Sequence, residues 1–131
     1  MGTHAMIGYY NKEDGSVEAS YVHYDGYVAG VGVTLIHFYT TETAAKAVTS
    51  VGYLSSLDRD FETSVEEAVH KNESPVPYES VEQFMKNGYD YAGADYLYLW
   101  DGTDWFVASR YGETRFTDVK TILSENDKKV A

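Results

Sequence analysis

The chain of 131 residues contains no cysteine, which excludes disulfide bonds, thiolate catalysis and cysteine-ligated metal centres. It has no run of about 20 apolar residues, the length that crosses a bilayer as a helix, and no secretory signal pattern. Only 10 residues are Lys or Arg against 21 Asp or Glu, so the formal net charge is −11. We therefore expect no direct nucleic-acid partner and no membrane association.

What the sequence does contain is enough apolar surface for one packed domain. Hydrophobic residues make up 44% of the chain, and aromatic residues 15%. Met6 opens the first strand-like run, so we expect residues 1–5 to be an expression remnant. Residues 6–124 are expected to form a single α+β domain, and residues 125–131, which have little apolar surface, a flexible tail.

Turn and capping patterns place the expected elements. The expected strands are 6–10, 16–24, 95–100 and 105–110, paired as two hairpins around glycine-containing turns. The expected helices are 30–39, 42–50, 64–71 and 81–87, and residues 116–123 are ambiguous. This order predicts an α+β fold in which the N-terminal and C-terminal hairpins form an antiparallel sheet. Two to four short helices would cover one face of that sheet.

A longer motif follows the first hairpin. It reads Tyr21-x-His23-Tyr24-Asp25-Gly26-Tyr27-x-x-Gly30-Val31-Gly32. This motif resembles one in small uncharacterised proteins of tailed bacteriophages, where it reads Tyr-x-His-Trp/Tyr-Asp-Gly-Tyr-x-x-Gly-Val-Gly. A second similarity lies at Gly52-x-Leu54-Ser55-Ser56-Leu57, so the resemblance covers about the first half of the chain. The resemblance implies a phage accessory protein that acts in the host cytoplasm, and it transfers no catalytic residue.

The motif itself is a candidate ligand site. Asp25 follows His23 by two residues and could fix the tautomer of the imidazole, while glycines before a helix expose N–H groups that can hold an anion. The alternative is a tight turn with close backbone packing and a hydrogen-bonded strand histidine. The candidate binding residues of this segment are His23, Tyr24, Asp25, Gly26, Tyr27, Gly30 and Gly32.

A second candidate site follows from the late hairpin. Arg110 and Arg115 lie beside Tyr111 in the sequence. Together with Tyr98, Trp100 and Trp105 they could form an aromatic and guanidinium pocket that suits a purine ring and a phosphate. The alternative is an ordinary aromatic core with surface ion pairs.

No pattern indicates catalysis, a metal or a cofactor. The histidines have no metal-ligand spacing, and no nucleophile elbow is present. We therefore expect no catalytic residues, no metal, no cofactor and a protein that is not an enzyme. A small nucleotide hydrolase that uses His23 or His37 stays open as an alternative.

Acidic residues are concentrated in residues 58–104, where 12 Asp or Glu face three Lys or Arg and supply −9 of the −11 charges. Such a surface attracts basic grooves, so an acidic inhibitor of a host enzyme or nuclease, of the nucleic-acid-mimic type, is a second alternative. The other interpretation is that these charges only keep the protein soluble.

The preferred prediction is stoichiometric binding without chemistry. A phage accessory protein of this kind would antagonise host defence by sequestering a small nucleotide-like signal in the host cytoplasm. The predicted partner is that small ligand, or a host protein under the second alternative. The bulky residues on both faces of residues 95–100 leave a homo-oligomer open.

Overall fold

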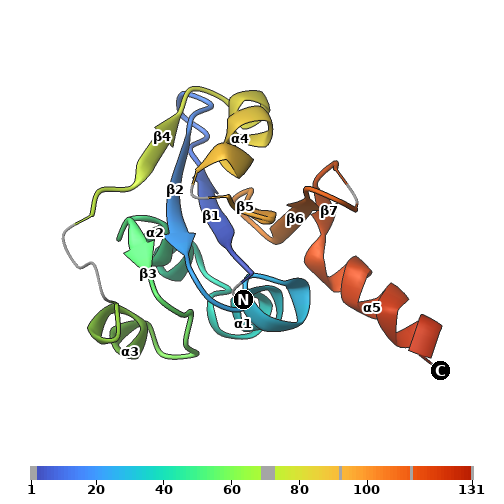
Figure 1. Cartoon of the computed structure of the whole chain (residues 1–131). Coiled ribbons are helices and arrows are strands. Elements are labelled where there is room, and N and C mark those ends of the chain that lie inside the picture. Colours follow the sequence, from blue (N-terminus) through green and yellow to red (C-terminus); the bar gives the residue numbers. More distant parts are fainter. Residues whose placement is uncertain (1–2, 69–72, 92, 113, 131) are drawn as a thin grey trace.

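A computed structural model describes residues 3–68, 73–91, 93–112 and 114–130, with side chains as far as residue 124. In these ranges the chain forms one mixed sheet of seven strands with five α-helices, in the α+β class (Figure 1). The sheet order is β3-β2-β1-β5-β6-β7, and β4 also pairs with β2.

Both predicted hairpins are confirmed. β1 (Ala5–Tyr10) pairs antiparallel with β2 (Val17–Val22), and β5 (Tyr96–Trp100) pairs antiparallel with β6 (Trp105–Ser109). Gly15 and Gly102 take positive φ values of 77° and 109° in the two turns, a conformation that glycine adopts without steric cost.

The sheet is not purely antiparallel, which corrects the expected architecture. β1 and β5 lie side by side in parallel, with Ala5 opposite Tyr96 and Tyr9 opposite Trp100. A parallel pair needs a long crossover connection, and here the helices between the two hairpins supply it. The hairpins therefore join through their first strands to form the centre of the sheet (Figure 1).

Three short strands complete the edges. β3 (Tyr53–Leu54) runs parallel to β2, whereas β4 (Val76–Tyr78) runs antiparallel to it. β7 (Thr117–Asp118) pairs with β6 within the segment whose pattern was ambiguous. Strands of two or three residues are too short to show the alternation of apolar and polar residues that identifies a strand in a sequence. Pro77 in β4 is tolerated because proline at an edge strand costs no ladder hydrogen bond.

Side chains cap three of the described α-helices, at Thr41, Asp60 and Ser80. The five α-helices and two shorter turns are the π-helical η1 (Val28–Gly32), α1 (Val33–Phe38), α2 (Glu42–Thr49), α3 (Phe61–Glu66), α4 (Val81–Asn87), the 3-10 turn η2 (Gly88–Asp90) and α5 (Val119–Val130). The predicted cap of α4 is confirmed, because the Ser80 side chain accepts a hydrogen bond from the Gln83 N–H.

One helix start was predicted wrongly. α3 begins at Phe61 rather than Ser64, because the Asp60 carboxylate accepts the Thr63 N–H and caps the helix three residues earlier. Ser64 is instead fully buried in that helix. The predicted end of this helix near Lys71, and His70, lie outside the described residues.

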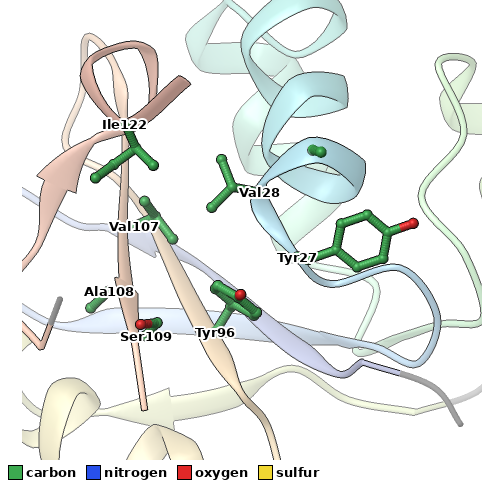
Figure 2. A pocket seen from close by; sticks show the side chains of 8 residues that line it. Tyr27, Val28, Tyr96, Val107, Ala108, Ser109 and Ile122 are labelled. Atoms are coloured by element: carbon green, nitrogen blue, oxygen red, sulfur yellow. The ribbon is translucent and has the colours of Figure 1, made fainter. Parts of the chain in front are cut away.

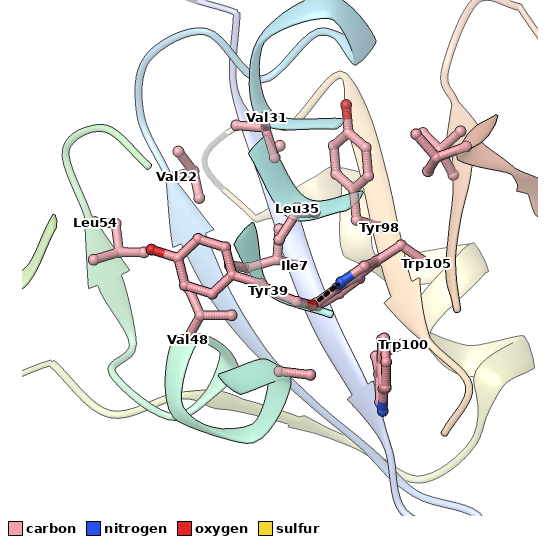
Figure 3. Close-up of a cluster of buried hydrophobic side chains, with 14 residues drawn as sticks. Ile7, Val22, Val31, Leu35, Tyr39, Val48, Leu54, Tyr98, Trp100 and Trp105 are labelled. Atoms are coloured by element: carbon pink, nitrogen blue, oxygen red, sulfur yellow. Dashed lines mark hydrogen bonds between the residues drawn. The ribbon is translucent and has the colours of Figure 1, made fainter. Parts of the chain in front are cut away.

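Helices cover both faces of the sheet, where one covered face was expected. On one face Ile7, Tyr98 and Trp105 pack with Leu35 of α1 and Val48 of α2 (Figure 3). On the other face α4 brings Phe84 against Met6, Leu97 and Leu99. Residues on alternate sides of the central strands are buried, which explains why β5 lacks a polar face.

The domain extends beyond the expected limits at both ends. Ala5 is fully buried in β1 and pairs with Val22, and the His4 carbonyl accepts the Asp95 N–H at 2.9 Å. The start of the chain thus supplies ladder hydrogen bonds to two strands. At the other end the backbone of α5 stays helical through Val130, and α5 projects away from the sheet (Figure 1). Across the described part of the chain, no helix has both the length and the apolar character needed to cross a bilayer.

Candidate functional site

A groove of about 350 Å³ opens where η1, the start of β5, the end of β6 and α5 meet. Tyr27 and Val28 form one side of it, and Tyr96, Val107 and Ile122 the other (Figure 2). These side chains come from four elements, of which η1 lies far in sequence from the other three. The volume lies in the range of small-molecule sites, and the walls are mainly apolar.

The two tyrosines give the groove its aromatic surface. Tyr27 is 41% exposed, and its hydroxyl donates a 3.3 Å hydrogen bond to the Asp25 carboxylate. Tyr96 is half-buried, and its ring is stacked against that of Tyr98 with centroids 6.4 Å apart. Tyr98 is fully buried and donates its own hydroxyl to the Gly26 carbonyl at 2.7 Å. The core therefore supports one side of the Tyr96 ring.

A second cavity of about 410 Å³ adjoins the first, because Tyr96 and Ser109 line both. Its other walls are more polar and include Thr3, Asp95 and the highly exposed Tyr111. The Asp95 carboxylate receives a long hydrogen bond of 3.4 Å from the His4 N–H. Because the two cavities adjoin at these side chains, we treat them as one groove: the first is called its apolar half, and the second, the less apolar of the two, its polar half.

The motif's backbone is folded tightly upon itself. Asp25 takes a positive φ of 59°, and its carbonyl accepts the Val31 N–H at 2.9 Å. The N–H of Gly26 donates to the Thr3 carbonyl, and the N–H of Gly30 to the Tyr27 carbonyl. Both glycine amides are thus used inside the fold and are not directed at an anion.

Close packing explains why the motif contains these glycines. A Cβ atom on Gly30 would lie 2.3 Å from the Asp25 carbonyl oxygen, and one on Gly26 would lie 2.9 Å from the Thr3 carbonyl oxygen. Gly32 is buried, and its Cβ would lie 3.4 Å from the ring of Tyr98. The glycines let the loop approach the N-terminal segment and the core.

The start of the motif lies in a cluster of tyrosine and histidine rings around Tyr21. The Tyr21 hydroxyl and the His23 Nδ1 are hydrogen-bonded at 2.8 Å, and the His4 ring stacks on His23 with centroids 4.6 Å apart. Tyr53 and Tyr91 lie 5.6 and 5.7 Å from the Tyr21 ring. Burial of the Tyr21 hydroxyl is the main cause that raises its pKa to about 12, and electrostatic repulsion from Tyr53 and Tyr91 raises it further.

His4 has a fixed role in this cluster. Its Nδ1 donates to the His23 carbonyl at 2.6 Å, since a carbonyl can only accept. Tyr24 packs edge-on against His23 and is 50% exposed. His23 and Tyr24 therefore lie in the ring cluster, whereas Tyr27 lies in the groove.

Trp100 and Trp105 lie in the core, each 2% exposed. Trp105 donates its indole N–H to the Tyr39 carbonyl at 2.7 Å, and Trp100 donates to the Glu42 carboxylate at 3.0 Å. Their rings pack against each other with centroids 5.4 Å apart. Neither indole faces either half of the groove.

The structure does not bring the two arginines together with the indoles. Arg110 donates to the carbonyls of Ala94 and Tyr89, and its guanidinium lies 5.5 Å from the centre of the Tyr89 ring. Arg115 is exposed, in the segment between β6 and β7. Arg110 therefore does not share a pocket with the two buried indoles.

Of the predicted site residues, Tyr27 lines the groove. Sequence reasoning missed Tyr96, Asp95, Ser109 and Ile122, which complete it. The sequence held one indication of Tyr96: it is the first of the bulky aromatic residues on one face of β5, and it lies at the half-buried end of that strand. Asp95 and Ser109 lie at the open end of the predicted late hairpin, so that pairing indicated their proximity, whereas the sequence gives no indication that Ile122 joins them.

The described residues include no group of three or more His, Asp or Glu side chains arranged to hold a metal ion. Comparison of the chain with protein families, with curated proteins and with solved structures finds no match. Fold and site together define an α+β protein with a mixed sheet and one two-part groove.

Proposed function

We propose that this protein acts by stoichiometric binding of a small nucleotide-like ligand, whose flat ring lies in the groove against Tyr96. The observation that carries this proposal is the placement of two tyrosine rings and three aliphatic side chains around one open volume of about 350 Å³ (Figure 2). Aromatic walls bind planar heterocycles by stacking, and burial of the ring adds a hydrophobic contribution.

The biological role follows from the motif's resemblance to tailed-phage proteins. A phage accessory protein that holds a nucleotide-like signal would lower its free concentration in the host cytoplasm and so antagonise a host defence. Binding alone performs this role, and it needs no catalytic group.

Calorimetric titration and ligand-induced thermal shift with nucleosides and nucleotides test the proposal. Tyr27→Leu and Tyr96→Leu should each weaken binding by about fivefold, because each loses an aromatic contact worth about 1 kcal/mol. Tyr24→Leu is the matched control, since this tyrosine is 50% exposed, close to the 41% of Tyr27, and belongs to the same motif but lies outside the groove. Equal loss in all three variants, or turnover of the ligand, would contradict the proposal.

A further inference from the structure

We infer that the groove prefers nucleosides, and their amine-bearing derivatives, over the corresponding phosphorylated nucleotides. This inference rests on the proposed function, because it narrows the ligand class of the same groove. The carrying observation is that Asp95 lines the polar half, which adjoins the apolar half where the ring would lie.

The geometry of the groove decides which part of a ligand meets Asp95. Tyr96 and Ser109 line both halves, so the two volumes meet at these side chains. A ring that stacks on Tyr96 in the apolar half directs its substituent into the polar half. In a nucleoside this substituent is the ribose, whose hydroxyls can donate to a carboxylate.

Asp95 retains the capacity to accept such hydrogen bonds. It is half-buried, and its Oδ2 accepts the long hydrogen bond from the His4 N–H. The carboxylate therefore presents negative charge to whatever enters the polar half.

The walls supply no compensating positive charge. Within the described chain, no lysine or arginine lines either half of the groove. Arg110 is turned toward the Ala94 and Tyr89 carbonyls, and Lys120 on α5 pairs with Asp104 at 3.5 Å. A phosphate group in the polar half would thus meet Asp95 without a cation, in the field of a protein of net charge −11.

The same arrangement favours a cationic substituent. An ammonium group in place of the 5′-hydroxyl would form a charge-assisted hydrogen bond with the Asp95 carboxylate, which is stronger than a neutral one. The order of affinity expected from the groove is therefore amine first, then hydroxyl, then phosphate.

Calorimetric titration of the full chain with matched ligands tests this order. The probes are adenosine, guanosine, cytidine and uridine, each beside its 5′-monophosphate, and 5′-amino-5′-deoxyadenosine beside adenosine. For the base that binds, the monophosphate should bind about tenfold more weakly than the nucleoside, and the 5′-amine should bind more tightly than the nucleoside by a similar factor. Raising the salt concentration should reduce both differences in affinity, because salt screens exposed charges.

Two variants locate the effect. Asp95→Asn keeps the side chain's shape, so the affinity for the nucleoside should change by less than about threefold. The affinities for the monophosphate and for the amine should both move toward the affinity for the nucleoside. Arg115→Ala should leave the order unchanged. Tight monophosphate binding that Arg115→Ala abolishes would overturn the inference and leave the proposed function standing, whereas failure of every probe to bind would overturn both.

Discussion

The indole Nε1 of Trp105 donates a 2.7 Å hydrogen bond to the backbone carbonyl of Tyr39, which joins β6 to the end of α1 (Figure 3). Tyr39 in turn donates its hydroxyl to the Asp58 carbonyl at 2.6 Å. Both side chains are almost completely buried. This pair connects the late hairpin, the first helix and the loop before α3 within one core.

Trp105→Phe should destabilise the fold by about 2–3 kcal/mol. The substitution removes the indole N–H, leaves the buried Tyr39 carbonyl unpaired and reduces the packed volume. Urea unfolding measures the loss, and calorimetry on the folded variant should show ligand affinity unchanged. A variant that keeps its stability but loses affinity would place this ring in the binding site.

Gly30→Ala should destabilise the protein by about 3 kcal/mol, because the new methyl group would lie 2.3 Å from the Asp25 carbonyl oxygen. Backbone atoms cannot rotate away as a flexible side chain can, so the loop must shift. Gly15→Asn is the control at a turn with open space around it, where asparagine tolerates the positive φ. Thermal unfolding compares the two, and similar small shifts would contradict the packing role of Gly30.

Glu42→Gln should change how stability depends on acid. Hydrogen bonds from the Tyr9 hydroxyl and then the Trp100 indole lower the pKa of the Glu42 carboxyl below its usual 4.5. A lowered pKa in the folded state gives stability that is present above pH 4.5 and lost as pH falls further. The difference in urea midpoint between wild type and variant should shrink between neutral pH and pH 3. Because Glu42 is exposed, we expect this difference to be small. A gap that widens in acid would contradict this assignment.

The ring cluster predicts an alkaline transition. Burial raises the pKa of Tyr21 to about 12, so its stabilising effect is complete below pH 10 and lost as pH rises through 12. Ultraviolet titration of Tyr21→Phe should show one fewer phenol that ionises near pH 12. The hydrogen bond to Glu42 raises the pKa of Tyr9 to about 12 as well, and burial raises the pKa of Tyr39, Tyr78, Tyr89 and Tyr98, so other late phenols should remain in this variant. Loss of a phenol that ionises near pH 10 would place Tyr21 in solvent instead.

Features set by neighbouring residues could be predicted from the sequence. The turns at Gly15 and Gly102 and the cap at Ser80 were recognised because a few adjacent residues determine them. The pairing of β1 with β5 could not be recognised, because β1 presents apolar residues to both layers whichever strand lies beside it. The α+β class was thus predicted, and the mixed sheet was not.

The candidate site shows the same division. Tyr27 and Trp105 were both proposed as binding residues from their aromatic character, yet Tyr27 is 41% exposed and Trp105 2%. Burial depends on which elements meet, and composition carries no information about that. Asp95 is half-buried beside the groove for the same reason, since the N-terminal segment and β6 meet there.

The parallel contact between Ala5 and Tyr96 spans most of the polypeptide. A ribosome that adds roughly 5–20 residues per second synthesises the second partner on the order of ten seconds after the first. During this interval β1 has one edge without its neighbour, and such an edge can pair with another chain. Newly made protein should therefore depend on chaperones and low concentration until residue 100 leaves the exit tunnel.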